Sequence, residues 1–318
     1  LDAEPVARLM GGAPMVTSTG RAYEVETHYL SKPLPPTSRF EAALSALIVE
    51  AYWVSAHLGG TILVFLPGEG EIHRAAAQLA AFNLTGVTIA PLFGAMTFGA
   101  QRQAIAPIAQ GRKIVLATSI AETSLTIPDV RVVVDGGRAR RARFDPNSGM
   151  ARLVTEKVTR AEATQRKGRA GRVSAGLYFP LWTRGEEGAL AAFPPAEIEA
   201  ADLTGLALEL ALWGGSDEMA FLTPPPSGAL AMARSLLCDL GALEKSPTGF
   251  RLTPHGRALA GLPLHPRLAH MVIMAGGSDL ACLIATLLAE RDPLPTAPPD
   301  LLLRIKSVQS PQSFQRDH

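Results

Sequence analysis

The stretch "TILVFLP", Thr61 to Pro67, holds five consecutive apolar residues and is closed by Pro67 and Gly68. A short apolar run of this kind, rich in β-branched residues, is typical of a strand that is buried on both faces of a parallel sheet. The stretch therefore predicts a central strand. The segments around it decide what kind of domain it belongs to.

Strand-like and helix-like segments alternate on both sides of this strand. Helices are predicted at residues 41–58, 71–82, 98–109 and 160–165, and further strands at 21–30, 86–94, 112–119, 131–137 and 176–182. This rhythm of strand, helix and strand is that of an α/β domain with a doubly wound parallel sheet. A turn-rich segment, "FDPNSGM" (Phe144 to Met150), lies between two polar-edged strands and predicts a β-hairpin.

The sequence changes character after Trp182. Amphipathic helical segments are followed by a short two-stranded segment and by "TPHGRALA", where Thr253 is the expected N-cap and Pro254 the first helical residue. Gly241 is expected in a left-handed conformation at the end of the preceding helix. Helices followed by a β wing predict a winged-helix domain, and two further helical segments follow it.

Charge is unevenly distributed along the 318 residues, although the net charge is only +1. Residues 131–172 contain 12 Lys and Arg against 4 Asp and Glu, a local net charge of +8. A basic block in a neutral protein is typical of a surface that binds an anionic polymer, and a solvated basic face is the alternative. The two cysteines and seven histidines show no spacing typical of a disulfide framework or a zinc site. No apolar run reaches the length of a membrane-spanning helix, so we expect a cytoplasmic protein with reduced thiols.

The segment "QRKGRAGR", Gln165 to Arg172, concentrates four basic side chains in eight residues. Arginine suits phosphate oxygens because its guanidinium is planar, always charged and forked. Arg169 and Arg172 lie three residues apart and would share one face of a helix. Gly168, Ala170 and Gly171 have small side chains or none, so they would allow a ligand to approach that face closely. Arg166 and Lys167 are expected to be surface or packing residues.

Four segments occur in a fixed order: "ILVFLPGEGEI" (62–72), "APLFGAMTFGAQRQAI" (90–105), "VLATSIAETSLTIPDV" (115–130) and "QRKGRAGR" (165–172). Together they resemble motifs IV, IVa, V and VI of the second RecA-like domain of superfamily 2 helicases, specifically the DEAH-box RNA helicases. The later sequence looks like the winged-helix and helical domains of that family, most of all of its bacterial HrpB type. The resemblance covers nearly the whole chain.

The resemblance implies a domain order. Residues 1–20 would be a remnant of the first RecA-like domain with a linker, and 21–185 the second RecA-like domain. Residues 186–265 would form the winged-helix domain, and 266–318 the start of a helical domain.

The resemblance also assigns site residues. Gln165, Arg169 and Arg172 match positions at the γ-phosphate of ATP, with Gln165 positioning water, and Ser124, Thr126 and Asp129 match positions near the nucleotide. Gly94, Thr118, Ser119, Arg141 and Arg143 match positions along the nucleic acid. Glu122 is given no catalytic role and is interpreted as a structural partner of a basic neighbour. The chain departs from the family at Ser119, where an Asn is usual, at Pro128, where an acidic residue is frequent, and at Ala106, where many relatives have a base-stacking Phe.

Two family motifs are absent from the printed sequence. It has neither G-x-x-x-x-G-K-[ST] nor the DEAH tetrapeptide, so the magnesium ligands and the catalytic base would lie on the first domain. The resemblance thus implies the C-terminal portion of a monomeric helicase that uses ATP and Mg²⁺ and moves on single-stranded RNA. The isolated chain is expected to be inactive as an ATPase. A non-enzymatic nucleic-acid-binding or partner-docking module and a DNA helicase are the alternatives.

Overall fold

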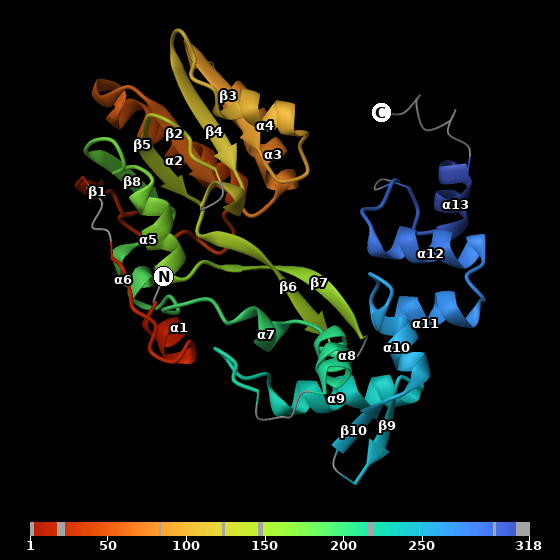
Figure 1. The fold of residues 1–318 in the computed structure, drawn as a ribbon. Helices are drawn as coiled ribbons and strands as arrows, with labels where there is room; N and C mark the ends of the chain where they lie inside the picture. Colours follow the sequence, from red (N-terminus) through yellow and green to blue (C-terminus); the bar gives the residue numbers. More distant parts are fainter. Residues whose placement is uncertain are drawn as a thin grey trace. The chain divides into compact units, whose positions relative to one another are not determined.

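The computed structural model describes residues 3–17, 23–82, 84–122, 125–145, 149–214, 219–247, 249–294 and 297–309 (Figure 1). The chain divides into two compact units. The sheet unit contains residues 16–143 and 152–195, and the helical unit contains residues 1–15, 144–151 and 196–318.

The sheet unit is built on six parallel strands in the order β1-β8-β5-β2-β4-β3 (Figure 1). Their bounds are β1 Val25–Thr27, β2 Thr61–Phe65, β3 Val87–Leu92, β4 Arg112–Ala117, β5 Val130–Asp135 and β8 Gly176–Pro180. All five residues of β2 are buried, and β2 pairs in parallel with both β4 and β5. The predicted central strand and the doubly wound α/β class are confirmed.

Helices cover both faces of this sheet. On one face, α2 (Phe40–Val54) and α3 (Glu69–Ala80) pack on alternate strand residues such as Ile62 and Val64. On the other face, α4 (Phe98–Ile105) and α5 (Arg160–Gly168) pack on the intervening residues, such as Leu63 and Phe65. Because strand side chains alternate, a strand as apolar as β2 serves both layers of the core. The short elements η1 (Ala56–Leu58), η2 (Ser119–Ala121) and α6 (Arg184–Gly188) complete the unit.

Several predicted elements are shorter in the structure than expected; for example, the helix predicted over residues 41–58 ends at Val54. The strand expected over residues 21–30 is formed only at Val25–Thr27, with residues 21 and 22 outside the described part of the chain. The helix expected to reach Ala109 ends at Ile105, and Ala106 is extended, with φ −60° and ψ 144°. The reason is Pro107, because a proline pushes the preceding residue out of the helical region.

The predicted hairpin is formed by β6 (Arg138–Asp145) and β7 (Met150–Lys157), which pair only with each other among the described strands. Only two residues, Gly136 and Gly137, separate the end of β5 from the start of β6, so the base of the hairpin lies next to the sheet. Its turn, residues 146–148, lies outside the described residues.

The helical unit is a succession of helices with one small antiparallel sheet (Figure 1). Its elements are α1 Glu4–Leu9, α7 Glu197–Ala200, α8 Thr204–Trp213, α9 Ser227–Asp239, β9 Leu243–Ser246, β10 Gly249–Leu252, α10 Pro254–Ala260, α11 Pro266–Met274, α12 Asp279–Ala289 and α13 Leu301–Gln309. Thr253 caps α10 by accepting a hydrogen bond from Gly256 N at 2.9 Å, and Gly241 has φ +69°, as both were predicted. The structure sets the boundary between units after Pro195 and leaves 196–318 undivided. The assignment of winged-helix and helical domains stays a prediction.

Candidate nucleotide and nucleic-acid site

Helix α5 leads into the "QRKGRAGR" segment. Thr159 and Glu162 form a capping box at its start: Glu162 N donates to Thr159 Oγ1 at 3.3 Å, and Thr159 N donates to Glu162 Oε2 at 2.7 Å. The helix ends at Gly168. The prediction that Arg169 and Arg172 share a helical face is therefore wrong, because both residues follow the last helical turn.

Arg169 is 3% exposed and tied to the segment that follows β4. Its Nε donates to the carbonyl oxygen of Glu122 at 3.0 Å, and its Nη1 donates to that of Leu125 at 2.9 Å. Its Nη2 is buried with no hydrogen-bond partner among the described residues. Burial lowers the pKa of Arg169, and the positive charge of Arg172 lowers it further. Arg169 thus keeps one hydrogen-bond donor without a partner among the described residues.

The neighbours of Arg169 divide between solvent and core. Gln165 and Arg172 are exposed, and Gly168 has open space where a Cβ would be. Ala170 is buried, and a Cβ on Gly171 would meet the backbone oxygen of Tyr23 at 2.6 Å. Of these three small residues, only Gly168 therefore leaves open space at the surface, because Ala170 and Gly171 pack inward.

Arg166 is 1% exposed, which contradicts a surface position and makes it a packing residue. Its Nε donates to Glu122 Oε1 at 2.6 Å, and its Nη1 donates to Asp135 Oδ1 at 2.7 Å. The guanidinium also lies 4.9 Å from the centroid of the Phe65 ring. Burial lowers the pKa of Arg166, but the charges of Asp135 and Glu122 outweigh it and raise the pKa. The interpretation of Glu122 as a structural partner of a basic residue is confirmed.

Asp135 is a second fixed point of this network and was missed from the sequence. It is fully buried at the end of β5 and accepts hydrogen bonds from Tyr178 Oη at 3.0 Å and Gly137 N at 2.8 Å. Burial raises the pKa of Tyr178 well above its ordinary value, and Asp135 adds to this. The sequence signal for Asp135 was a single acidic residue at the end of an apolar strand, in "RVVVDGG".

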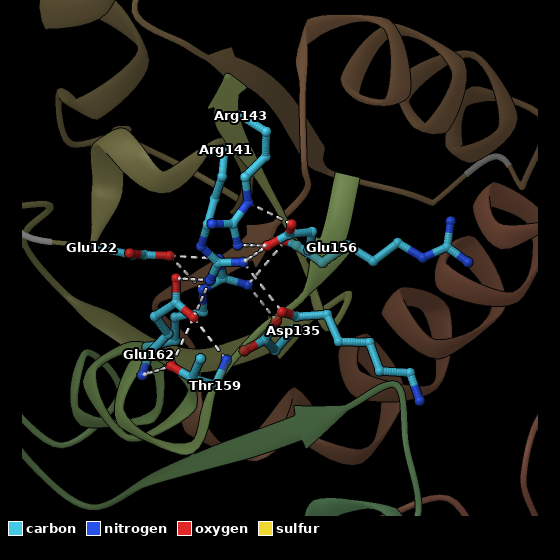
Figure 2. A network of polar contacts seen from close by, with 10 residues as sticks. Glu122, Asp135, Arg141, Arg143, Glu156, Thr159 and Glu162 are labelled. Carbon is cyan, nitrogen blue, oxygen red and sulfur yellow. Dashed lines mark hydrogen bonds and ion pairs between the residues drawn. The ribbon is translucent and has the colours of Figure 1, made fainter. Parts of the chain in front are cut away.

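Figure 2 shows how the hairpin joins the same region. Arg141 donates to Glu162 at 2.6 Å and to Glu156 Oε2 at 3.1 Å, and Arg143 donates to Glu156 through two bonds of 2.8 Å. The carboxylates hold both side chains, so the positive charge of these two predicted nucleic-acid contacts is largely compensated. Glu162 links the hairpin to the first turn of α5.

The predicted nucleotide-side residues lie on the segment between β4 and β5. Thr126 is exposed, and Ser124 lies outside the described residues. Asp129 is exposed and has φ +56°, and its Oδ1 accepts a hydrogen bond from Thr61 Oγ1 at 3.2 Å. The bonds of Arg169 to Glu122 and Leu125 join this segment to the end of α5.

Three predicted nucleic-acid residues follow neighbouring strands at one edge of the sheet. Gly94 comes after β3, and Thr118 and Ser119 come directly after β4, with Leu92 and Ala117 in register at the strand ends. Thr118 N donates to the carbonyl oxygen of Leu92 at 3.1 Å, and Gly94 and Ser119 are exposed. The carboxyl ends of parallel strands are where open α/β sheets bind ligands.

Within the described residues, no three His, Cys, Asp or Glu side chains are grouped to hold a metal ion. No described helix is long and apolar enough to span a membrane.

Comparisons with known proteins agree with this architecture. Residues 41–174 match the helicase conserved C-terminal domain. The chain is 44% identical over 292 residues to the ATP-dependent RNA helicase HrpB of Escherichia coli, an alignment that covers 91% of this chain and 35% of that protein. It is 34% identical over 302 residues to the ATP-dependent RNA helicase HrpA of Escherichia coli, covering 92% of this chain and 23% of that protein.

A solved structure shows the same similarity. The crystal structure of the Escherichia coli DEAH/RHA helicase HrpB superposes with a TM-score of 0.83 at 40% identity, covering 94% of this chain and 37% of that one. The chain thus spans about a third of the length of its HrpB relative. Residues 41–174 thus match the helicase conserved C-terminal domain, and the chain is similar in sequence and in its RecA-like fold to the HrpB helicase over about nine tenths of its own length.

Proposed function

We propose that this chain supplies one side of the ATP site and part of the RNA path of an ATP-dependent RNA helicase. The observation that carries the proposal is Arg169, which is buried, whose pKa the positive charge of Arg172 lowers, and whose Nη2 has no hydrogen-bond partner among the described residues. A phosphate group would satisfy that donor and relieve the repulsion between the two cations. The HrpB and HrpA relatives, named as ATP-dependent RNA helicases, support the same assignment.

In this proposal Arg169 and Arg172 stabilise the charge that develops on the γ-phosphate oxygens during transfer. Arginines brought to a nucleotide from a second domain act in this way, and only when the cleft between the domains is closed. Gln165 is exposed one turn before Arg169 and would orient the attacking water. Arg169 is held by the backbone carbonyls of Glu122 and Leu125, so its position depends on the segment that carries Ser124, Thr126 and Asp129. We assign those three residues to the nucleotide side.

ATP and Mg²⁺ need binding residues beyond those assigned to the nucleotide above. The described residues offer no group of carboxylates that could hold Mg²⁺. The backbone oxygen of Glu122 binds Arg169, but its carboxylate is held by Arg166. We therefore assign the metal ligands to a domain that carries the phosphate-binding and DEAH motifs.

For RNA, we propose that a single strand passes the carboxyl edge of the sheet at Gly94, Thr118 and Ser119. Hydroxyls and backbone groups suit contacts to phosphate and sugar, which do not depend on base sequence. Arg141 and Arg143 would contribute from the hairpin in competition with Glu156 and Glu162. The helicase would act as a monomer, alternating between open and closed clefts as it moves.

The test uses a chimera in which the region of Escherichia coli HrpB that precedes the matched segment is joined to this chain. Arg169→Ala should lower the kcat of ATP hydrolysis about 10³-fold or more, because a transition-state arginine contributes that much. The Kd for a single-stranded RNA should change less than about twofold. Arg160→Ala, at the exposed start of the same helix, is the matched control and should leave both values unchanged.

Loss of ATP hydrolysis and RNA binding together would argue for a structural role of Arg169 and against the proposal. Stimulation of the ATPase by DNA but not by RNA would favour a DNA helicase. RNA binding by a chimera that hydrolyses no ATP would favour a non-enzymatic binding module.

A further inference from the structure

A pocket of about 170 Å³ lies in the sheet unit at the edge where β5 and β8 end. Its apolar wall consists of Leu34, Phe40, Leu181, Trp182 and Leu190. None of the residues assigned above to ATP or RNA lines it. The pocket is therefore additional to the proposed site.

The two ends of the hairpin meet at this pocket and bring two cations to it. Arg138 is the first residue of β6 and Lys157 is the last residue of β7, and both are exposed. The Arg138 guanidinium lies 4.2 Å from the centroid of the Phe40 ring. Within the described part of the chain, neither cation has an ion-pair or side-chain hydrogen-bond partner, whereas Arg141 and Arg143 on the same strand are paired.

The acids near these cations are committed elsewhere. Glu186 lines the pocket, but its Oε2 accepts from Thr183 N at 2.9 Å and from Thr183 Oγ1 at 3.0 Å, as part of a capping box. The charge of Arg138 acts on Glu41, but the Glu41 carboxylate accepts a hydrogen bond from Arg74 Nε at 2.8 Å. The lining of the pocket thus carries two cations and the one carboxylate of Glu186, which leaves a net positive charge.

Trp182 adds a polar requirement to the apolar wall. The side chain is 7% exposed, and its indole N–H is buried without an acceptor among the described residues. An unpaired buried donor costs about 1–3 kcal/mol, so an acceptor on a bound molecule would be favourable. An aromatic wall beside unpaired cations is the combination with which proteins bind single-stranded nucleic acid, the ring against the base and the cations on the phosphate.

The position of the pocket favours the same ligand. Strands β8, β5, β2 and β4 are consecutive neighbours in the sheet, so the end of β8 is three strand spacings from the end of β4. At about 4.8 Å per spacing this is roughly 14 Å. Thr118 and Ser119 follow β4 at this same edge. A strand that passes them could reach the pocket without leaving the edge of the sheet.

We infer that the pocket holds one nucleotide of single-stranded RNA, with its phosphate at Arg138 and Lys157 and a ring against Trp182. The inference rests on the proposed function, because it concerns the same RNA strand. An acidic peptide is the other ligand that the cations would fit. The aromatic wall and the shared sheet edge favour the nucleotide.

The experiment uses the fluorescence of Trp182 in the full 318-residue chain. The sequence has three tryptophans, and Trp53 and Trp213 are 65% and 72% exposed, so Trp53→Phe with Trp213→Phe leaves Trp182 as the single reporter. Titration with a uridine decamer should quench this fluorescence with a saturable curve. Arg138→Gln and Lys157→Gln should each raise the Kd about fivefold or more and lower the slope of log Kd against log salt by about 0.7, the value for one phosphate contact on a single strand.

Arg131→Gln is the matched control, because Arg131 lies at the amino end of β5, at the opposite edge of the sheet. It should leave the Kd and the salt slope unchanged. Lys157 is exposed and has no side-chain partner among the described residues, so its variant keeps the test valid if Arg138→Gln does not fold.

Anisotropy of a labelled decamer, measured in parallel, separates the two proposals. RNA binding that leaves Trp182 fluorescence unchanged would overturn the pocket and leave the proposed function standing. Absence of RNA binding by both measurements would contradict the two together. Quenching by an acidic peptide and not by the decamer would also overturn the inference, because the pocket would then belong to a protein partner.

Discussion

At the scale of single residues, Arg166 and Arg169 lie three positions apart but differ in their surroundings. Arg166 is surrounded by the two carboxylates of Glu122 and Asp135 and by the Phe65 ring. Arg169 meets only neutral carbonyls and keeps its Nη2 without a partner among the described residues. The compensated Arg166 stabilises the fold, whereas our proposal assigns the uncompensated Arg169 to a phosphate. The proposal rests on this contrast more than on the number of basic residues.

Arg166→Met should destabilise the sheet unit by about 3–5 kcal/mol, because it leaves buried carboxylates without their counter-charge. Urea unfolding followed by Trp182 fluorescence measures the change. Lys167→Met is the matched neighbour, since Lys167 is half-buried and makes one hydrogen bond, to Thr27 Oγ1 at 2.8 Å. It should cost less than about 1.5 kcal/mol. Equal effects of the two variants would refute the central place of Arg166 in the network.

At the scale of elements, the hairpin is anchored by charge. Its arginines bind Glu156 on β7 and Glu162 on α5, so the strands of the hairpin and the helix that precedes Arg169 are joined by ion pairs (Figure 2). The carboxylate of Glu156 is shared by Arg141 and Arg143. The same arginines can contact RNA only to the extent that these acids release them.

Glu156→Gln should therefore strengthen RNA binding by the 318-residue chain, because it frees Arg143 and loosens Arg141. The Kd for a single-stranded RNA should fall a few-fold, and the salt slope should steepen by up to about 0.7. Filter binding across a range of salt concentrations measures both. Glu197→Gln, an exposed acid on α7, should have neither effect. An unchanged Kd for Glu156→Gln would remove the hairpin arginines from the RNA path.

The start of α8 is held by a second charged contact. His265 Nδ1 accepts from Arg267 N at 3.2 Å, so in this tautomer its Nε2–H donates to Asp202 Oδ2 at 2.9 Å. Burial raises the pKa of Asp202, but the hydrogen bonds from His265 and Thr204 outweigh it and lower the pKa to about 2.

A carboxyl pKa that is lowered by folding stabilises the protein above the unfolded value, near 3.9, and the stabilisation is lost as the pH falls toward 2. Asp202 should thus contribute about 2 kcal/mol at pH 6 and little at pH 2. Asp202→Asn should flatten the fall of unfolding free energy between pH 5 and pH 2, measured by urea denaturation of the helical unit in the full chain. An identical pH profile for both proteins would contradict this assignment.

The sequence predicts elements better than contacts, and particular residues show why. Thr61 to Pro67 defines a buried strand by its apolar run alone, and Pro107 explains where α4 ends. The burial of Arg166 was not predictable, because Glu122 and Asp135 lie 44 and 31 positions away in the chain. The pairing of Arg143 with Glu156 is likewise visible only once the hairpin brings them together. Long-range partners decide which charges remain available, and a local pattern does not contain them.

At the scale of the whole molecule, our proposal assigns two arginines of this chain to a phosphate, whereas the printed sequence lacks the motifs that bind the rest of ATP. It has no G-x-x-x-x-G-K-[ST] segment and no DEAH tetrapeptide. It spans about a third of its Escherichia coli HrpB relative. The proposal that follows is a divided active site, in which this chain contributes the γ-phosphate side and a second domain contributes the metal and the remaining phosphates.

ATP hydrolysis by the 318-residue chain, measured alone and as the chimera with the preceding region of Escherichia coli HrpB, tests this claim most directly. We expect no turnover above background for the purified chain at any RNA concentration. We expect RNA-stimulated turnover for the chimera, lost in Arg169→Ala. Steady hydrolysis by the 318-residue chain itself, abolished by the same substitution, would contradict the divided site.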